Sequence, residues 1–159
     1  MYKSLNIYTE RLYLRPIKSE DAAAYAELLS DPTVHPFVTE QGPPQNIAVL
    51  LAQKQMDLLQ KKSLTLSICF EESFVGYVSV HQWQQIRPAI SYAISPCFQK
   101  RGFAREALQG LLHALPHDGV RKLVAQTHFD NIASVNLLLA VGFEEQASTL
   151  TRRVFHWHA

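Results

Sequence analysis

Two adjacent runs of β-branched and aromatic residues, separated by a short polar turn, constrain the fold of this chain most. The runs cover residues 64–70 and 74–80, and Glu71, Glu72 and Ser73 stand between them. Runs of this composition favour strands, and a turn this short joins antiparallel neighbours. The sequence therefore predicts an antiparallel hairpin near the middle of the chain.

Further strands and helices are predicted on both sides of this hairpin. Alternating apolar residues predict a strand near 12–16, and Ser19 followed by two acids predicts a capped helix through about residue 29. Helical spacing predicts a second helix over 46–60. More strands are predicted at 89–94, 122–127, 143–149 and 152–157, and more helices at 103–115 and 130–140. This order predicts an α/β fold, a mixed sheet with helices on its faces.

Length and charge exclude several classes of protein. The 159 residues fit one domain that spans the whole sequence. Fifteen Lys and Arg residues against fourteen Asp and Glu residues give a formal net charge of +1, which disfavours a general nucleic-acid binder. No apolar run approaches the ~20 residues of a membrane-spanning helix, and the first residues lack a signal-peptide pattern. We expect a cytoplasmic protein whose partners are neither nucleic acids nor membranes.

The cysteines and histidines predict neither a disulfide framework nor a metal centre. Cys69 and Cys97 lack a CxxC spacing, so packed or unreactive thiols are expected. Of the seven histidines, only His113 and His117 have the i, i+4 spacing of a helix, and Pro116 interrupts that helix. We therefore expect no metal cofactor.

The loop between the predicted strand 89–94 and the helix at 103 has the composition of an anion-binding site. Lys100, Arg101 and Arg105 are basic, and Gly102 directly precedes Phe103. Free amide N–H groups at a helix N-terminus attract anions, and a glycine lets a phosphate approach the backbone. The same residues also fit an ordinary helix start beside solvated basic side chains. Neither GxxxxGK[ST] nor GxGxxG occurs, so the usual ATP and NAD signatures are missing.

Three segments, in the correct order, resemble one enzyme family. Residues 99–104, QKRGFA, resemble the acyl-CoA motif Q/R-x-x-G-x-G/A of the GNAT superfamily of N-acetyltransferases. Residues 131–143 resemble the N-x-x-S-x7-G-F segment of its RimJ/RimL-like branch, and residues 9–16, TERLYLRP, resemble the opening of that branch. The resemblance implies a single N-acetyltransferase domain over 1–159. It also implies a mostly antiparallel sheet of about seven strands with a splayed central pair and about four flanking helices.

The resemblance implies how acetyl-CoA, the acyl donor, binds. Pantetheine would enter between the strands at 89–94 and 122–127 and pair with the backbone of the first, and the pyrophosphate would rest on the loop amides. The helix that starts after residue 130 would hold the pantetheine arm, although its first asparagine also fits a simple helix cap. The implied acetyl-CoA contacts are Tyr92, Ala93, Ile94, Lys100, Arg101, Gly102, Phe103, Ala104, Arg105, Asn131 and Asn136.

Acyl transfer to an amine makes three chemical demands on such a site. The amine must lose a proton, the oxyanion needs a hydrogen-bond donor, and the leaving thiolate must be stabilised. The resemblance implies a backbone N–H near Ile94 as the oxyanion donor. The tyrosine that often protonates the thiolate is replaced here by Leu138, so Ser134 becomes the candidate acid. A first-turn serine also commonly bonds only to its own backbone.

The candidate bases are two histidines at the ends of predicted strands. Many relatives carry a strand glutamate where this chain has Ala89. Histidine titrates near physiological pH, which makes His81 and His128 the candidates, although a strand histidine is more often structural. Lesser candidates are Glu40 and Asp130 as bases and Phe37 and Trp83 as walls of an acceptor site.

The predicted function is N-acetyl transfer from acetyl-CoA to a primary amine by direct attack in a ternary complex. The acceptor is a protein N-terminus or a small amine, and the near-neutral charge of the chain does not distinguish them. The alternative is a non-catalytic acyl-CoA-binding sensor, which the missing tyrosine and glutamate favour. Strand edges of this fold class can pair between subunits, which is compatible with a homodimer.

Overall fold

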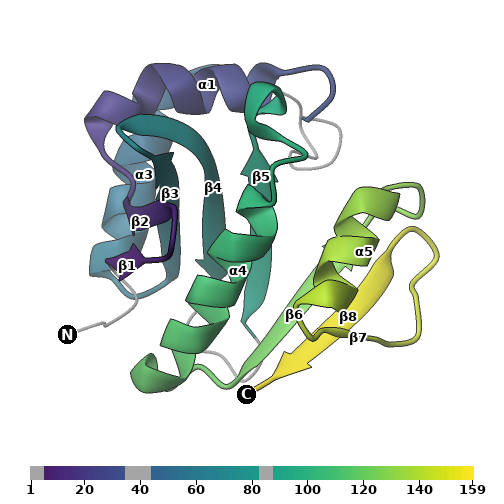
Figure 1. Ribbon diagram of the computed structural model, residues 1–159. Coiled ribbons are helices and arrows are strands. Elements are labelled where there is room, and N and C mark those ends of the chain that lie inside the picture. The colour runs from purple at the N-terminus through teal and green to yellow at the C-terminus, as the bar shows by residue number, and fades with distance from the viewer. Residues whose placement is uncertain (1–5, 35–43, 83–87) are drawn as a thin grey trace.

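The computed structural model describes residues 6–34, 44–82 and 88–159. Within these ranges the strands form one eight-stranded sheet of order β1-β2-β3-β4-β5-β6-β8-β7 (Figure 1). Each neighbouring pair is antiparallel except β5 and β6, which are parallel. The strands are β1 (Ile7–Tyr8), β2 (Leu12–Pro16), β3 (Ser63–Phe70), β4 (Ser73–His81), β5 (Ala89–Ile94), β6 (Lys122–Thr127), β7 (Glu144–Glu145) and β8 (Arg153–His158). The predicted mixed, mostly antiparallel sheet is confirmed.

Helices cover both faces of the sheet. Among the described residues the α-helices are α1 (Ala22–Ser30), α3 (Ile47–Leu59), α4 (Phe103–Ala114) and α5 (Ile132–Ala140), with 3-10 turns at Ser19–Asp21, Pro96–Phe98 and Leu115–Asp118. Figure 1 shows α4 and α5 in front of the sheet and α3 behind it. The buried residues of α4 and α5 share one core with Val78, whereas those of α1 and α3 share a second core with Tyr77. Neighbouring residues of a strand point to opposite faces, so β4 separates the two cores.

The central hairpin forms as predicted. β3 and β4 pair from Ser63 opposite His81 to Phe70 opposite Ser73, with one register shift between Ile68 and Cys69. Seven consecutive residues of β3, from Ser63 to Cys69, are buried, as expected for a strand covered on both faces. No helix of the described residues is both long and apolar enough to cross a bilayer.

Two local predictions are wrong, and one strand was not predicted. The two-residue strand β1 is too short to leave a sequence signal, and the strand predicted over 143–149 is only Glu144–Glu145. Ser19 does not cap the first helix, because it begins a 3-10 turn that precedes α1, and α1 has no side-chain cap. The buried carboxylate of Asp21 accepts the Lys18 amide at 2.9 Å. Arg15 and Ser67 also donate to Asp21, at 2.8 and 2.7 Å. Burial raises the pKa of Asp21, but these hydrogen bonds outweigh it and hold the pKa below its usual value.

Candidate active site

The parallel strands β5 and β6 diverge from a single point of pairing. Their register joins Ala89 to Val124, and the Val124 amide donates to the Pro88 carbonyl at 2.9 Å. By contrast, β5 pairs with β4 along all six of its residues, and β6 pairs with β8 along all six of its own. Gly76 lets β4 and β5 approach closely, because a Cβ at this position would lie 2.3 Å from the Ala93 carbonyl oxygen. The predicted splayed central pair is therefore present, and each strand is held by its outer neighbour.

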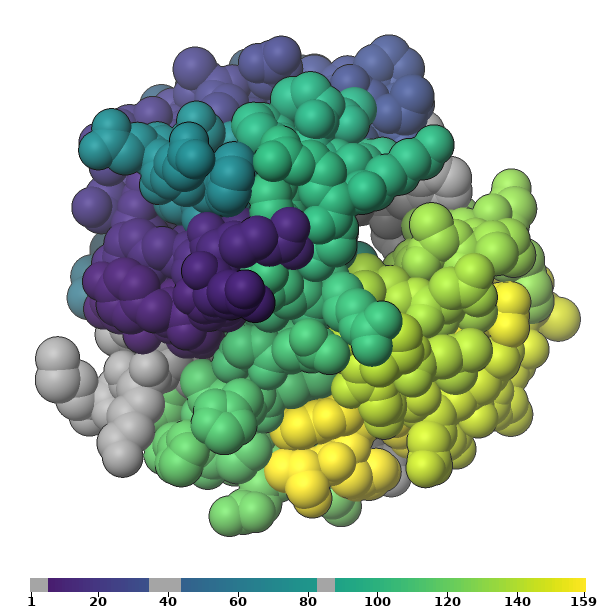
Figure 2. Space-filling model, viewed as in Figure 1, coloured from purple at the N-terminus to yellow at the C-terminus, as the bar shows by residue number. Residues whose placement is uncertain are grey.

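A cleft of about 530 Å³ occupies the gap between the diverging strands. Figure 2 shows the surface hollowed between the green residues that follow β5 and the yellow-green residues of α5. One wall consists of β5, the loop after it and the start of α4, and the other consists of β6 and α5. Most residues that the sequence assigns to acetyl-CoA meet here: Tyr92, Ala93, Ile94, Lys100, Gly102, Phe103, Ala104, Arg105 and Asn131 line the cleft.

The loop before α4 has an unusual backbone. Lys100 and Gly102 both have a positive φ, of 61° and 80°. Alternation of left- and right-handed residues turns successive amides toward one side and makes an anion-binding concavity. Gln99 closes the loop, because its Nε2 donates to the Ile94 carbonyl at 2.9 Å. Gly102 is needed for its positive φ and also for space, since a Cβ there would lie 3.3 Å from Nη2 of Arg11.

An ion pair braces this loop from behind. Glu106 of α4 accepts hydrogen bonds from Thr9 Oγ1 at 2.5 Å and from the amide and Nε of Arg11, both at 2.8 Å. Arg11 Nη1 in turn donates to the Arg101 carbonyl at 2.9 Å. Burial raises the pKa of Glu106, but the hydrogen bonds from Thr9 and Arg11 hold it below its usual value. This cluster, Thr9, Arg11 and Glu106, is called the loop brace below.

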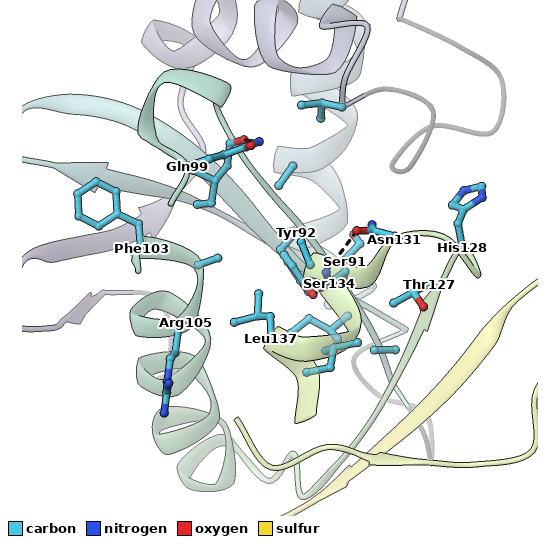
Figure 3. Close-up of a pocket in the computed structure, with 18 of the residues that line it drawn as sticks. Ser91, Tyr92, Gln99, Phe103, Arg105, Thr127, His128, Asn131, Ser134 and Leu137 are labelled. Carbon is cyan, nitrogen blue, oxygen red and sulfur yellow. Dashed lines mark hydrogen bonds between the residues drawn. The ribbon is translucent and has the colours of Figure 1, made fainter. Parts of the chain in front are cut away.

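Two of the residues assigned to acetyl-CoA lie away from the cleft lining. The Arg101 guanidinium lies 4.8 Å from the centre of the buried Phe103 ring and 4.9 Å from that of Phe70, so its charge stacks on aromatic rings. Asn136 is exposed on α5 and does not line the cleft. The Phe103 side chain is buried, and Figure 3 shows its ring turned away from the other labelled residues.

A pair of hydroxyl groups joins the two walls. Asn131 begins α5, and its Oδ1 accepts the Ser134 amide at 3.2 Å, which is the helix cap that the sequence allows. The Ser134 side chain turns to the opposite wall, where its Oγ lies 2.5 Å from the Tyr92 hydroxyl (Figure 3). Burial raises the pKa of Tyr92 to about 12, so this phenol stays protonated at neutral pH. Leu138, in the place of the family tyrosine, is fully buried.

The two candidate histidines occupy different places. His128 lines the cleft just after β6. His81 stands behind the cleft, and its Nε2 is 2.8 Å from Oγ of the cleft residue Ser91. Burial lowers the pKa of His81, and the charge of Lys54 lowers it further. Asp130 is exposed, whereas Phe37, Glu40 and Trp83 lie outside the described residues.

One buried polar atom at the cleft lacks a partner. Thr127, the last residue of β6, lines the cleft, and its Oγ1 is buried with no hydrogen bond among the described residues. An unpaired buried hydroxyl is costly in the free protein. The rings of His113 and His117 lie 6.1 Å apart. The described part of the chain holds no cluster of three or more His, Cys, Asp or Glu side chains suited to a metal ion.

Sequence reasoning missed three features of this site. The loop brace depends on Thr9 and Arg11, which the sequence placed only in a family-like opening segment. The Tyr92 side chain was overlooked because its backbone alone was assigned to the ligand, and Ser91 carried no signal beyond its place in a strand. Neighbouring residues of a strand face opposite sides of the sheet, so the strand pattern alone could have predicted that Ser91 and Tyr92 have different surroundings.

Comparison with known proteins agrees with this geometry. The family model described as the acetyltransferase (GNAT) domain matches residues 11–144. An uncharacterized N-acetyltransferase of Bacillus subtilis, YnaD, is 23% identical in an alignment of length 145 that covers 89% of this chain and 84% of that protein. Mycobacterium smegmatis RimJ in complex with a CoA disulfide superposes with a TM-score of 0.86 at 18% identity, over 100% of this chain and 90% of that one.

A second solved structure has the same fold. The ribosomal L7/L12 alpha-N-protein acetyltransferase RimL in complex with coenzyme A superposes with a TM-score of 0.86 at 16% identity, over 96% of this chain and 97% of that one. Fold and cleft together define an acetyltransferase. The chain belongs to the GNAT family, in which the acetyl group is transferred to an amine.

Proposed function

We propose that the chain binds acetyl-CoA in the cleft between β5 and β6 and transfers the acetyl group to a primary amine by direct attack. The observation that carries the proposal is the splay of β5 and β6 beside a loop with positive φ at Lys100 and Gly102 that leads into the N-terminus of α4. The pyrophosphate lies on the amides from Lys100 to Arg105, and Lys100 and Arg105 add charge. The backbone of Tyr92, Ala93 and Ile94 supplies the strand edge along which pantetheine runs.

The residues that line the cleft suit both the charged end and the thioester end of acetyl-CoA. Arg105 extends along α4, away from the Tyr92–Ser134 pair, so charged and thioester ends have separate positions (Figure 3). The unpaired Thr127 Oγ1 offers a hydrogen bond to a pantetheine amide, and Asn131 stands beside the same arm. Ser134, already hydrogen-bonded to a protonated phenol, lies where the thiolate leaves. The backbone N–H of Ile94 serves as the oxyanion donor, and His81 and His128 are the proposed bases.

The acceptor is a primary amine of a protein N-terminus or of a small molecule. RimL acts on a protein α-amino group, and this chain shares its fold. The two free cysteines, Cys69 buried and Cys97 exposed, agree with a cytoplasmic enzyme. The outer strands of the described sheet, β1 and β7, are the edges through which a homodimer would pair.

Two measurements test this function. Calorimetric titration should give tight binding of CoA and acetyl-CoA and much weaker binding of ATP, which lacks pantetheine. Thiol release from acetyl-CoA should then rise with at least one amine of a panel containing a short peptide with a free α-amino group, spermidine and kanamycin. Binding of acetyl-CoA without release of thiol at any pH from 6 to 9 would instead favour the acyl-CoA sensor. Leu138 and Ala89, which replace the family tyrosine and glutamate, are consistent with that function. No binding would overturn both functions.

A further inference from the structure

Consecutive residues of β5 face opposite sides of the sheet. Tyr92 turns to the side of α4 and α5, where it meets Ser134, whereas Ala93 belongs to the core of α1 and α3. Ser91, two residues before Ala93, faces that same second side. Both Ser91 and Tyr92 line the cleft (Figure 3). A thioester held there therefore has the Tyr92–Ser134 pair on one side and Ser91 on the other.

Ser91 is the centre of a hydrogen-bonded group on its face of the sheet. It lies directly opposite Ser79 in the β4–β5 ladder, so its diagonal neighbours are Tyr77 and His81. Ser91 Oγ is 2.8 Å from His81 Nε2 and also hydrogen-bonds with Tyr77. Burial raises the pKa of Tyr77, so this phenol keeps its proton, and the contact with Ser91 offsets that rise only in part. A hydroxyl has one proton and two lone pairs, so Ser91 can donate to His81 and keep one lone pair for a group in the cleft.

The surroundings of His81 keep its ring neutral. Ala89, directly opposite in the ladder, is small and leaves room for the imidazole to reach Ser91. Burial and the charge of Lys54 lower the pKa of His81, and the charge of Asp57 opposes them in part. Lys54 and Asp57 come from α3, and the Ser91 hydroxyl comes from β5. A neutral imidazole with its proton on Nδ1 leaves Nε2 free to accept.

We propose that Ser91 relays the proton of the attacking amine to His81, an inference that rests on the proposed acetyl transfer. The amine nitrogen forms a bond to the thioester carbonyl carbon, and its extra proton passes to Ser91 Oγ. Ser91 simultaneously gives its own proton to His81 Nε2, which becomes imidazolium. The carbon–sulfur bond then breaks, and the electron pair leaves on the CoA thiolate beside Ser134 and Tyr92. The imidazolium returns its proton to solvent, and the thiolate takes one from solvent.

The first test compares two serines of the same face. Ser91→Ala should lower the turnover of thiol release at least about 30-fold, within the range of general base catalysis, and leave acetyl-CoA affinity within about twofold. Ser79→Ala is the matched control, because Ser79 is buried opposite Ser91 but bonds to Thr65 Oγ1 at 2.8 Å and does not line the cleft. It should keep near-normal turnover. Ser91→Thr retains the hydroxyl and should restore much of the rate.

The pH profile separates a relay from a structural role. The wild-type kcat/KM for the fastest amine of the panel should fall through a pKa below 6.5, the ordinary histidine value, because burial lowers the pKa of His81. This limb should vanish in Ser91→Ala and persist in Ser79→Ala. Unchanged turnover in Ser91→Ala, or an unchanged acid limb, would overturn the relay while the acetyl-transfer function stands.

Nitrogen NMR of the histidine ring gives a test that needs no acceptor. We expect the tautomer with the proton on Nδ1 for His81, and a change in its Nε2 shift in Ser91→Ala. A proton on Nε2 in the wild-type protein would overturn the relay, because that nitrogen then cannot accept. If the wild-type protein binds acetyl-CoA but releases no thiol with any amine, the proposed function fails and the relay fails with it.

Discussion

The two walls of the cleft pack into one apolar core but differ in the polar contacts that are added to it. The loop in the wall of β5 and α4 is held by directed hydrogen bonds, one within the wall from Gln99 to the Ile94 carbonyl and one from the distant loop brace to the Arg101 carbonyl. The wall of β6 and α5 is held by apolar packing, in which Leu138 and Phe155 are fully buried. The hydroxyl groups of Tyr92 and Ser134 meet across the gap.

This difference indicates a division of tasks between the walls. Directed hydrogen bonds hold the loop amides in one orientation, which a charged ligand requires because anion binding depends on aligned donors. Apolar packing holds α5 at a set distance and presents a few polar groups to the uncharged part of the ligand. Substitutions in the first wall should therefore act mainly on affinity for the charged end of CoA, and substitutions in the second mainly on turnover or on pantetheine.

The largest effect, on stability, is expected from a substitution that prevents the close approach of β4 and β5. Gly76→Ala places a Cβ 2.3 Å from the Ala93 carbonyl, so β5 must shift, and we expect unfolding free energy to fall by about 3 kcal/mol. Urea denaturation measures this. Gly119→Ala is the control, because a Cβ there has no atom within 4 Å, and it should cost only the smaller strain of its positive φ. Equal stability of the Gly76 variant and the wild-type protein would mean that the splay does not depend on this contact.

The second prediction concerns the loop before α4, which is proposed to bind the pyrophosphate. Gly102→Val strains the positive φ of 80° and displaces Arg11, so CoA should bind roughly 30-fold more weakly, corresponding to about 2 kcal/mol. Gly119→Val is matched, because Gly119 has φ 88° with no atom within 4 Å of a Cβ. It should lose similar stability and keep CoA affinity. Calorimetry checks both variants, and equal affinities would remove the loop from CoA binding.

The third effect concerns the loop brace. Glu106→Gln weakens three charge-assisted hydrogen bonds and should cost about 1.5 kcal/mol of stability. CoA affinity should fall while affinity for pantetheine, which lacks the pyrophosphate, stays constant. A parallel loss for both ligands would contradict a role through the loop.

The brace also predicts a pH dependence of stability. Because the folded pKa of Glu106 lies below its ordinary value of 4.5, its stabilising contribution is complete above that pH. The contribution is lost as the pH falls through the folded pKa. The difference in unfolding free energy between wild type and Glu106→Gln should therefore shrink in acid, as urea titrations at successive pH values would measure.

The fourth prediction concerns Ser134, in the wall of β6 and α5. Ser134→Ala removes the hydroxyl beside the thiolate and should lower kcat about tenfold, or about 1.4 kcal/mol, with acetyl-CoA affinity unchanged. The helix cap by Asn131 remains, so stability should change little. Wild-type turnover at saturating substrates would remove Ser134 from the chemistry, and a loss of affinity alone would assign it to binding.

The smallest effect has opposite signs for stability and binding. Thr127→Val replaces an unpaired buried hydroxyl by a methyl group of similar shape and should raise the unfolding free energy by about 1 kcal/mol. The same change should weaken acetyl-CoA binding severalfold, because a hydrogen bond to pantetheine is lost. Thermal denaturation measures the change in stability, and calorimetry on the same sample measures the change in acetyl-CoA affinity. Stronger binding of acetyl-CoA would contradict a ligand contact at Thr127.

Much of the fold was accessible from local patterns. The hairpin, the strands at 12–16, 89–94 and 122–127, and the helices that became α3 and α4 agree with their predicted ranges within a few residues. The failed predictions share one cause, which is that contacts between residues far apart in the sequence decided the local structure. Ser19 begins a 3-10 turn instead of capping the helix, and the Asp21 carboxylate in that turn is held by Arg15 and Ser67 from two strands. The strand after Gly142 shortened to the two residues that meet β8.

The sequence by itself determined most of the secondary structure, the family and the loop proposed to bind the pyrophosphate, because each depends on residues close together along the chain. Apolar periodicity, a basic loop and a glycine before a helix are all local signals. The tertiary structure alone decided the partners within the site. Tyr92 and Ser134 are 42 residues apart, Arg11 and Glu106 are 95 apart, and Ser91 and His81 meet only as diagonal neighbours in one register. Register and long-range packing depend on every element together, so no local pattern encodes these contacts.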